Sequence, residues 1–265
     1  MSAPLLRLER DGPHATITLD DAPRQNALSP EMVAQLDRAL EACPGAASLT
    51  IAGANGVFSA GADLKSLAAA LASVPGPGEP DPLRDQNRAG GQFFARFNAN
   101  PVATIALVDG AAVGGGMGLA CCADIVIATH RARFALAETS LGIPPAQIAP
   151  YLVARLGERH ARRLALTGAR TDGREAAAIG LADYFCETDE ARDATLANLR
   201  KQIGRCAPGA NAATKRLIAA CRDGATPAYL EDAARSFASC LRGPEGREGV
   251  AAFVEKRAPN WAGAK

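Results

Sequence analysis

The sequence has almost no net charge and no long apolar run, and each shortage excludes a class of protein. Its 29 Lys and Arg residues against 28 Asp and Glu residues leave a formal charge of +1 over 265 residues. Without a basic field, neither nucleic acid nor an anionic membrane is an expected partner. No apolar run reaches the roughly 18 residues of a membrane span, and residues 1–12 lack a secretory signal's apolar region. We therefore expect a cytoplasmic protein.

Metal ligands are also scarce. The three histidines and seven cysteines show neither a CxxC repeat nor paired histidine spacing, so no metal site is predicted. Cysteine is most often a small buried apolar residue, and the adjacent Cys121 and Cys122 fit that role. Apolar residues make up 48% of the chain and charged residues 22%, an ordinary globular composition. The sequence thus predicts a folded enzyme or binding protein that meets its ligand at a local site.

Hydrophobic periodicity predicts an α/β core followed by a helical tail. Strand patterns alternate with helical ones until about Glu190, and helical patterns alone follow. This alternation indicates βαβ units with right-handed crossovers. We divide the chain into a core of residues 1–195 and a C-terminal helical region of residues 196–265. Strands are expected in a hairpin at 5–8 and 15–19 and at 49–53, 102–108, 124–128 and 133–135, and helices from Ser29-Pro30 onward and at 64–71, 84–97 and 119–122.

Two turns of small residues each lead from a strand into a helix. In the first, Phe58–Leu64, the helix begins at Asp63 or just after it. Backbone N–H groups at such a turn lack an intrahelical partner and attract negative charge. A plain strand-to-helix connection capped by Asp63 explains the same residues. The segment alone leaves both interpretations open.

The second turn, within Val108–Leu119, is richer in glycine. Three consecutive glycines, Gly114 to Gly116, let a ligand approach the main chain closely. A Walker loop would need a lysine after the glycines, and a Rossmann fingerprint would need glycine or alanine at Leu119. What remains is a pair of turns that present N–H groups. Together they can form an oxyanion hole, in which each donor stabilises the transition state by about 3 kcal/mol.

Glu138 is the candidate general acid and base. It lies in the predominantly apolar segment Arg133–Pro145 without an evident basic partner. Burial in such surroundings raises the pKa of a carboxyl group toward the working pH. A surface or helix-capping carboxylate is the alternative interpretation. A thioester that becomes an enolate is the kind of substrate that would use one such group and two N–H donors.

These three segments, in this order and spacing, resemble the enoyl-CoA hydratase/isomerase (crotonase) family. The segments Arg24–Leu28 and Ala252–Arg257 are also similar, so the resemblance covers nearly the whole chain. It implies a crotonase-like α/β fold, a spiral of ββα repeats with a C-terminal helical region. It also implies a homotrimer or a dimer of trimers. The implied substrate is an acyl-CoA thioester, and no cofactor is expected because coenzyme A is part of the substrate.

The same resemblance assigns roles to individual residues. Ala62 and Gly115 would hold the thioester oxygen with their N–H groups, and Glu138 would transfer protons. Phe253 and Lys256 would approach the nucleotide part of coenzyme A, in many members from a neighbouring subunit; a solvated helix charge is the alternative for Lys256. The remaining substrate-binding residues by this resemblance are Arg24, Ala60, Asp63, Leu64, Gly114 and Gly118.

Two departures from the family pattern bear on the reaction. Typical two-glutamate hydratases carry a Glu where this chain has Gly118, so two carboxylates cannot share one water here. Glycine at this position is expected to leave free volume for a branched acyl chain. After Glu138 the usual Ile-Pro-Gly-x-Gly-Gly is replaced by Ile143–Tyr151. Together with the Gly-Gly-Gly-Met-Gly-Leu of residues 114–119, this segment resembles bacterial methylglutaconyl-CoA hydratases. The resemblance is greatest to the isohexenylglutaconyl-CoA hydratases of acyclic terpene (citronellol/geraniol) breakdown.

We therefore expect a lyase that adds water to the α,β double bond of a branched glutaconyl-CoA, isohexenylglutaconyl-CoA foremost. Three alternatives stay open: the 3-methylglutaconyl-CoA hydratase of leucine breakdown, a Δ3-Δ2-enoyl-CoA isomerase and an acyl-CoA-binding protein without catalysis. The isomerase needs only one base. Arg131, Arg133 and Arg155 are candidates for binding a distal carboxylate, and the sequence does not select among them.

Overall fold

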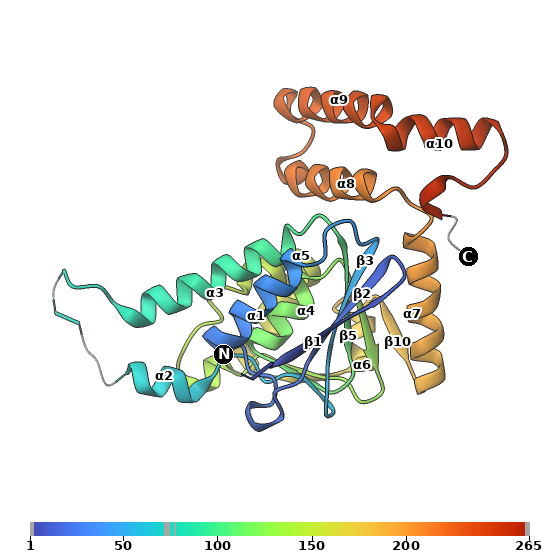
Figure 1. Ribbon diagram of the computed structural model, residues 1–265. Coiled ribbons are helices and arrows are strands. Elements are labelled where there is room, and N and C mark those ends of the chain that lie inside the picture. Colours follow the sequence, from blue (N-terminus) through green and yellow to red (C-terminus); the bar gives the residue numbers. More distant parts are fainter. Residues whose placement is uncertain (1–2, 72–74, 77, 263–265) are drawn as a thin grey trace.

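Two β-sheets carry the fold of residues 3–71, 75–76 and 78–262, which are the residues that the computed structural model describes (Figure 1). The larger sheet has the strand order β1-β2-β3-β5-β7-β10 and the smaller sheet β4-β6-β8-β9. The larger contains β1 (Leu6–Asp11), β2 (His14–Leu19), β3 (Ser48–Gly53), β5 (Ala103–Val108), β7 (Ile125–Thr129) and β10 (Tyr184–Cys186), and the smaller β4 (Val57–Ser59), β6 (Ala111–Val113), β8 (Arg133–Ala135) and β9 (Arg170–Asp172).

The chain follows the same path three times, which confirms the predicted spiral of ββα repeats. Strands β3, β5 and β7 of the larger sheet are each followed by β4, β6 and β8 of the smaller sheet, and then by a helical segment. Neighbouring repeats pair in parallel within both sheets. The C-terminal ends of β4, β6 and β8 therefore lie side by side. In α/β folds that edge is the usual place for a ligand.

Helices cover both sides of the sheets (Figure 1). On one side the helices pack in the order α1, α3, α4 and α5, and α7 lies on the other side against β7 and β10. The predicted start of α1 is confirmed, since the Ser29 hydroxyl accepts a hydrogen bond from the Met32 N–H at 3.1 Å. The helices of the core are α1 (Pro30–Glu41), α2 (Leu64–Ala70), α3 (Pro82–Asn98), α4 (Gly115–Cys122), α5 (Ala149–Thr167), α6 (Gly173–Ala178) and α7 (Asp189–Ile203).

Helix α4 lies at the centre of the core. All of its residues from Gly116 to Cys122 are buried, and it contacts β4, β5 and β6 as well as α3 and α5. The run of small residues in its sequence is what permits neighbours to approach on every side. The first residue of α4, Gly115, is thereby fixed against the ends of the smaller sheet's strands.

The C-terminal helices α8 (Pro208–Ala220), α9 (Pro227–Arg242) and α10 (Pro244–Val254) extend beyond the core (Figure 1). Lys215 attaches α8 to the sheet through Nζ, which lies 2.7 Å from Asp124 Oδ2 and 3.0 Å from the Val102 carbonyl. The boundary that we expect after residue 195 falls inside α7, whose Leu199 is buried with core residues of β5 and β7. The division into two regions stays a prediction.

Short elements are where sequence and structure differ. Strands β9 and β10 were not expected from the sequence, and β6 interrupts the segment that reads as one glycine-rich turn. Each has three residues, too few for an alternating pattern to stand out. Among the described residues, no helix combines the length and the apolar character that a membrane crossing requires.

Candidate active site

The predicted oxyanion-hole residues Ala62 and Gly115 lie against each other. Ala62 follows β4 and Gly115 follows β6, and these two strands are parallel neighbours. A methyl group added at Gly115 would lie 3.7 Å from the Ala62 amide nitrogen. A methyl group added at Gly61 would lie 2.9 Å from the Gly115 nitrogen. Backbone contact between the two turns therefore brings both amides to one place.

Both amides are free to bind a ligand. Within the described part of the chain, neither the Ala62 N–H nor the Gly115 N–H donates a hydrogen bond. Gly115 is the first residue of α4, so its N–H lies at the positive end of the helix dipole. Two unpaired N–H groups at the same point favour an oxygen atom that carries negative charge.

A network of buried polar groups holds the first turn in position. Asn26 donates from Nδ2 to the Val57 carbonyl at 2.7 Å, and its own carbonyl accepts from the Ser59 hydroxyl at 2.7 Å. The Gly61 carbonyl accepts from the Leu28 N–H at 2.7 Å. Asn26 and Ser59 are both almost fully buried. The segment Arg24–Leu28 thus supports the turn that carries Ala62.

Glu138 lies beside this pair of amides and packs against Gly114, the N-cap residue of α4. It follows β8, and the Gly114 N–H donates to the last carbonyl of β8, that of Ala135, at 2.8 Å. A methyl group added at Gly114 would lie 2.7 Å from Glu138 Oε1. The carboxylate therefore rests against the residue that immediately precedes Gly115. The three predicted catalytic residues come together at the ends of three adjacent strands.

Burial changes the pKa of the Glu138 carboxyl. Its side chain is half-buried, and Oε2 is inaccessible to solvent and has no hydrogen-bond partner among the described residues. Loss of hydration disfavours the charged form and raises the pKa of the Glu138 carboxyl above its ordinary value. A carboxyl with a raised pKa and a free oxygen is a competent general base and acid.

A threonine fixes the short helix that carries this carboxylate. Glu138 is the first residue of the 3₁₀ helix η2 (Glu138–Leu141). Thr139 donates from Oγ1 to the Ala165 carbonyl of α5 at 2.7 Å. At the other end of η2 the Ile143 N–H donates to the Glu138 carbonyl at 3.1 Å. These bonds hold the Glu138 backbone between β8 and α5.

The free volume that we expect beside Gly118 is absent, and this expectation was wrong. A methyl group added at Gly118 would lie 2.2 Å from Ile148 Cγ2 and 2.8 Å from Ile148 Cβ. Ile148 is 4% exposed. The Ile148 side chain therefore fills the space that glycine leaves. Gly118 is buried beneath Ile148, so it has no direct contact with a ligand.

The other predicted binding residues of the core surround the first turn. Ala60 is half-buried, and Leu64, the first residue of α2, is 55% exposed. Asp63 accepts hydrogen bonds from the Lys65 N–H at 3.1 Å and the Ser66 hydroxyl at 2.7 Å. The Ser66 bond is the main cause that lowers the pKa of the Asp63 carboxyl. Asp63 thus caps α2, as the simpler interpretation of this turn predicts.

Arg24 lies near the first turn, where its positive charge is one of the smaller causes that lower the pKa of the Asp63 carboxyl. Its Nε lies 2.6 Å from Asp21 Oδ2, and its side chain is 36% exposed against 4% for Asp21. The guanidinium is therefore oriented by a buried carboxylate while part of it faces solvent. That arrangement suits binding of an anionic group such as a phosphate.

Phe253 and Lys256 are not brought to the site within one chain. Both follow or belong to α10, which lies at the opposite end of the molecule from α2 (Figure 1). Phe253 is 84% exposed, and Lys256 is also exposed. A role for either residue in binding therefore requires a second copy of the chain.

The arginines considered for a distal carboxylate are occupied. Arg131 pairs with Asp109 at 2.8 Å and with Asp189. Arg155 pairs with Asp183 at 3.1 Å and reaches the Ala123 and Asp124 carbonyls, and Arg133 donates to two backbone carbonyls of its own turn. Within the described ranges, no three His, Cys, Asp or Glu side chains gather in a way that could hold a metal ion.

Sequence reasoning missed the residues that shape the site without reacting. Asn26 has a positive φ of 56° and Gly61 one of 84°. Both residue types tolerate such angles, but their presence in a sequence only weakly indicates a turn of this kind. Ile148 carried no signal at all. Its contact with Gly118 joins positions 30 residues apart and depends on how α4 and α5 pack.

Comparisons with known proteins find relatives that match nearly the whole chain. The model of the enoyl-CoA hydratase/isomerase family matches residues 10–264. The chain is similar to the solved structure of Pseudomonas aeruginosa AtuE, with a TM-score of 0.92 and 45% identity over 98% of this chain and 100% of that one. For an enoyl-CoA hydratase/isomerase from Marinobacter aquaeolei the TM-score is 0.92 and the identity 41%, over 98% and 99%. The 2,3-dehydroadipyl-CoA hydratase of Escherichia coli is 30% identical over 251 residues, 93% of this chain and 94% of the relative.

Proposed function

This chain belongs to the enoyl-CoA hydratase/isomerase family, and we propose that it adds water to the α,β double bond of a branched glutaconyl-CoA. The observation that carries the proposal is the buried Glu138 carboxylate with its free Oε2, beside two unpaired amides. A hydratase needs these two elements: donors for the enolate oxygen and a base for water.

The reaction follows from the positions of these groups. The thioester oxygen accepts hydrogen bonds from the Ala62 and Gly115 N–H groups, which draws electron density away from the β-carbon. Glu138 takes a proton from water as the water oxygen bonds to the β-carbon, and negative charge moves to the thioester oxygen. Glu138 then returns the proton to the α-carbon, and the enolate collapses to the saturated thioester. One carboxylate therefore performs both proton transfers.

We assign the acyl chain on two grounds. The segments 114–119 and Ile143–Tyr151 together resemble those of isohexenylglutaconyl-CoA and methylglutaconyl-CoA hydratases. A relative that is 30% identical is named for 2,3-dehydroadipyl-CoA, whose acyl chain carries a second carboxylate. Isohexenylglutaconyl-CoA, an intermediate of acyclic terpene breakdown, is our first choice, and 3-methylglutaconyl-CoA of leucine breakdown is the second.

A substrate panel tests this assignment. The purified protein is incubated with isohexenylglutaconyl-CoA, 3-methylglutaconyl-CoA and crotonyl-CoA, and loss of the enoyl absorbance is followed. We expect kcat/KM for a branched glutaconyl-CoA to exceed that for crotonyl-CoA by at least about tenfold, the effect of one well-matched group in a pocket. Faster turnover of crotonyl-CoA would reject the branched substrate.

One observation favours an isomerase as the second candidate. Ile148, an apolar side chain, occupies the space beside Gly118 where two-glutamate hydratases place a carboxylate. A Δ3-Δ2-enoyl-CoA isomerase moves one proton between two carbons with one base and excludes water. In deuterated water the isomerase exchanges deuterium into the acyl chain without forming a hydroxyacyl product, whereas the hydratase forms one.

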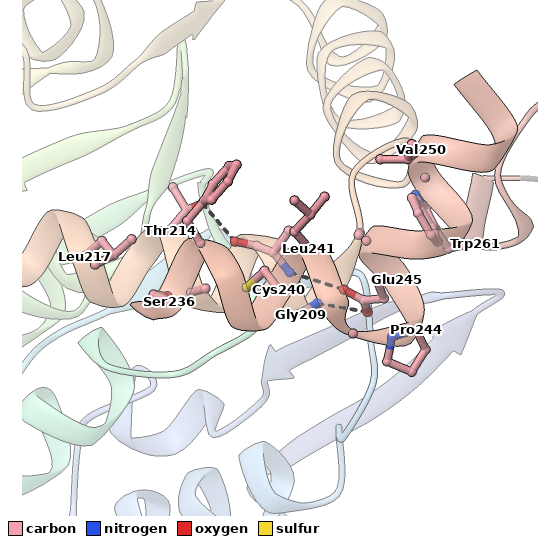
Figure 2. A pocket seen from close by; sticks show the side chains of 17 residues that line it. Gly209, Thr214, Leu217, Ser236, Cys240, Leu241, Pro244, Glu245, Val250 and Trp261 are labelled. Atoms are coloured by element: carbon pink, nitrogen blue, oxygen red, sulfur yellow. Dashed lines mark hydrogen bonds between the residues drawn. The ribbon is translucent and has the colours of Figure 1, made fainter. Parts of the chain in front are cut away.

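We also propose that the chain forms a homotrimer or a dimer of trimers through its C-terminal helices. Helices α8, α9 and α10 enclose a groove of about 820 Å³ whose lining includes Leu241, Val250 and Trp261 (Figure 2). Glu245 accepts hydrogen bonds from the Gly209 and Ala210 N–H groups, which ties α10 to the start of α8. The large apolar residues exposed on these helices are Ile218, Leu230, Phe237, Leu241, Val250, Phe253 and Val254. So much exposed apolar surface is typical of a protein–protein contact.

Phe237 tests the assembly, since its side chain is 70% exposed on α9. We expect F237D to shift the molar mass measured by light scattering from that of a trimer or hexamer to that of a monomer. F237L, which keeps the apolar surface, should retain the wild-type mass. A wild-type protein that runs as a monomer, or an F237D variant with unchanged mass, would contradict the proposal.

A further inference from the structure

Glu138 and Ile148 both pack against the N-terminal end of α4. Gly114 and Gly118 are separated by one helical turn, and the Gly118 N–H donates to the Gly114 carbonyl at 2.9 Å. Gly114 is the N-cap residue of α4, and Gly118 lies one turn into the helix. Glu138 covers the first of these glycines and Ile148 covers the second. The two glycines are four residues apart, about 6 Å of helix rise, so Glu138 and Ile148 pack against consecutive turns at the start of α4.

The segment that joins the two side chains is anchored at both ends. At its start, Thr139 donates to the Ala165 carbonyl of α5 at 2.7 Å. At its end, Gln147 donates from Nε2 to Asn87 Oδ1 of α3 at 2.7 Å. The Gln147 side chain lies directly over Gly91, where an added methyl group would be 2.1 Å from Gln147 Oε1. Ile148 is thus held in a fixed position rather than resting loosely against α4.

We propose that Ile148 determines which acyl chains this site accepts, by setting the size of the β-substituent that fits beside Glu138. The inference rests on the proposed function for its choice of acyl-CoA substrates. The thioester oxygen lies at the start of α4, at Gly115, and the β-carbon is two bonds from the thioester carbon. An acyl chain that places its β-carbon at Glu138 therefore meets Ile148 next along the helix.

The position of the Ile148 side chain depends on glycine at position 118. Any side chain at position 118 collides with Ile148 at Cγ2 and at Cβ, so a rotation of the isoleucine does not relieve the clash. A carboxylate at position 118 is consequently excluded unless Ile148 is also replaced. The pair Gly118 and Ile148 limits the site to one carboxylate and lines it with an apolar surface.

The first test measures binding of saturated acyl-CoA thioesters, which do not react. Dissociation constants for butanoyl-CoA and for thioesters with 3-methyl and longer 3-alkyl branches are measured by calorimetry on wild type and I148A. We expect I148A to improve the affinity for the longer branches by about tenfold relative to butanoyl-CoA, since a few methylene groups of pocket volume discriminate by that order. An equal change for linear and branched thioesters would overturn the proposal.

A double-mutant cycle is the second test. In G118A the new methyl group displaces Ile148 toward the acyl chain, so affinity for branched thioesters should fall more than affinity for butanoyl-CoA. I148A should restore most of the ratio in the double variant, because it removes Cγ2, the nearer contact at 2.2 Å, and leaves only the contact with Cβ at 2.8 Å. Gly116 provides the matched control on the same helix, since its added methyl group would lie 2.3 Å from the Ser59 carbonyl oxygen. I148A should not rescue G116A.

The outcomes separate this inference from the proposed reaction. If the wild type hydrates none of the glutaconyl-CoAs but the I148A ratio shifts as expected, the reaction is wrong and the role of Ile148 stands. If hydration occurs and the ratio stays constant in I148A, the role of Ile148 is wrong. Should G118A fail to fold by circular dichroism, the I148A and I148V ratios alone decide, with I148V expected between wild type and I148A.

Discussion

Replacing Glu138 with glutamine is expected to lower kcat by about a thousandfold. Glutamine keeps the size of the side chain and its place against Gly114, but it cannot take a proton from water. The two amides at Ala62 and Gly115 remain, so affinity for a saturated acyl-CoA should change little. Stopped-flow or steady-state kinetics with an enoyl-CoA and calorimetry with its saturated analogue measure the two effects separately.

The pH dependence follows from the same carboxyl group. Burial raises its pKa above the ordinary value of 4.5, and the reaction needs the deprotonated form. Activity of the wild type should therefore fall as the pH is lowered through this raised pKa, at a pH above 4.5. The residual activity of E138Q should lack this acid limb.

The free energy of unfolding should decrease as the pH rises through the same range in which the activity increases. Because the folded state binds the Glu138 proton more tightly than the unfolded chain, the wild type loses stability as the pH rises from below the unfolded pKa to above the folded one. E138Q does not undergo this loss. Its melting temperature should therefore exceed that of wild type at neutral pH, and the difference should shrink in acid.

Glu31 is the matched control for this substitution. It also has a buried oxygen, Oε1, without a hydrogen-bond partner among the described residues, but it lies in the first turn of α1. E31Q should leave kcat unchanged. A wild-type kcat in E138Q, or an equal loss in E31Q, would contradict the role given to Glu138.

Local sequence signals were sufficient wherever one strand or turn determined the outcome. The hairpin of β1 and β2 follows from alternation and the start of α1 from its capping residues. Strands β3, β5 and β7 follow from short, mostly apolar runs. Ala62, Gly115 and Glu138 each follow a short apolar strand, and parallel pairing of these strands brings them together. The spiral order itself came from the family resemblance, because periodicity does not specify which strands pair.

Features that depend on packing between distant segments could not be predicted. A glycine at position 118 was interpreted as free space, but Ile148 on a segment 30 residues later determines whether that space is free. From the sequence, Arg131 and Arg155 are candidates for binding a substrate carboxylate. In the folded chain their acidic partners are Asp109, Asp183 and Asp189, all distant in sequence. In each case the missing information is the position of a second side chain, which composition and spacing do not contain.

Replacing Gly61 with alanine should abolish most of the activity, although the added methyl group contacts neither Glu138 nor the substrate. Gly61 has a φ of 84°, and its added methyl group would lie 2.4 Å from the Val113 carbonyl oxygen and 2.9 Å from the Gly115 nitrogen. Both are backbone atoms, so one of the two turns must move. The Ala62 and Gly115 amides would then separate and no longer point at one oxygen. Loss of even one such donor lowers kcat by about 10²- to 10³-fold.

Gly45 distinguishes this effect from simple backbone strain. Its φ of 71° is also positive, but nothing lies within 4 Å of an added methyl group. G45A should therefore lose about 1 kcal/mol of stability from the left-handed conformation alone, seen as a lower melting temperature, and keep the wild-type kcat. G61A should remain folded by circular dichroism and still lose kcat, because its methyl group separates the amides. If G61A retained full activity, contact between the two turns would not be what holds the thioester oxygen, and catalysis here would depend on Glu138 without a two-amide site.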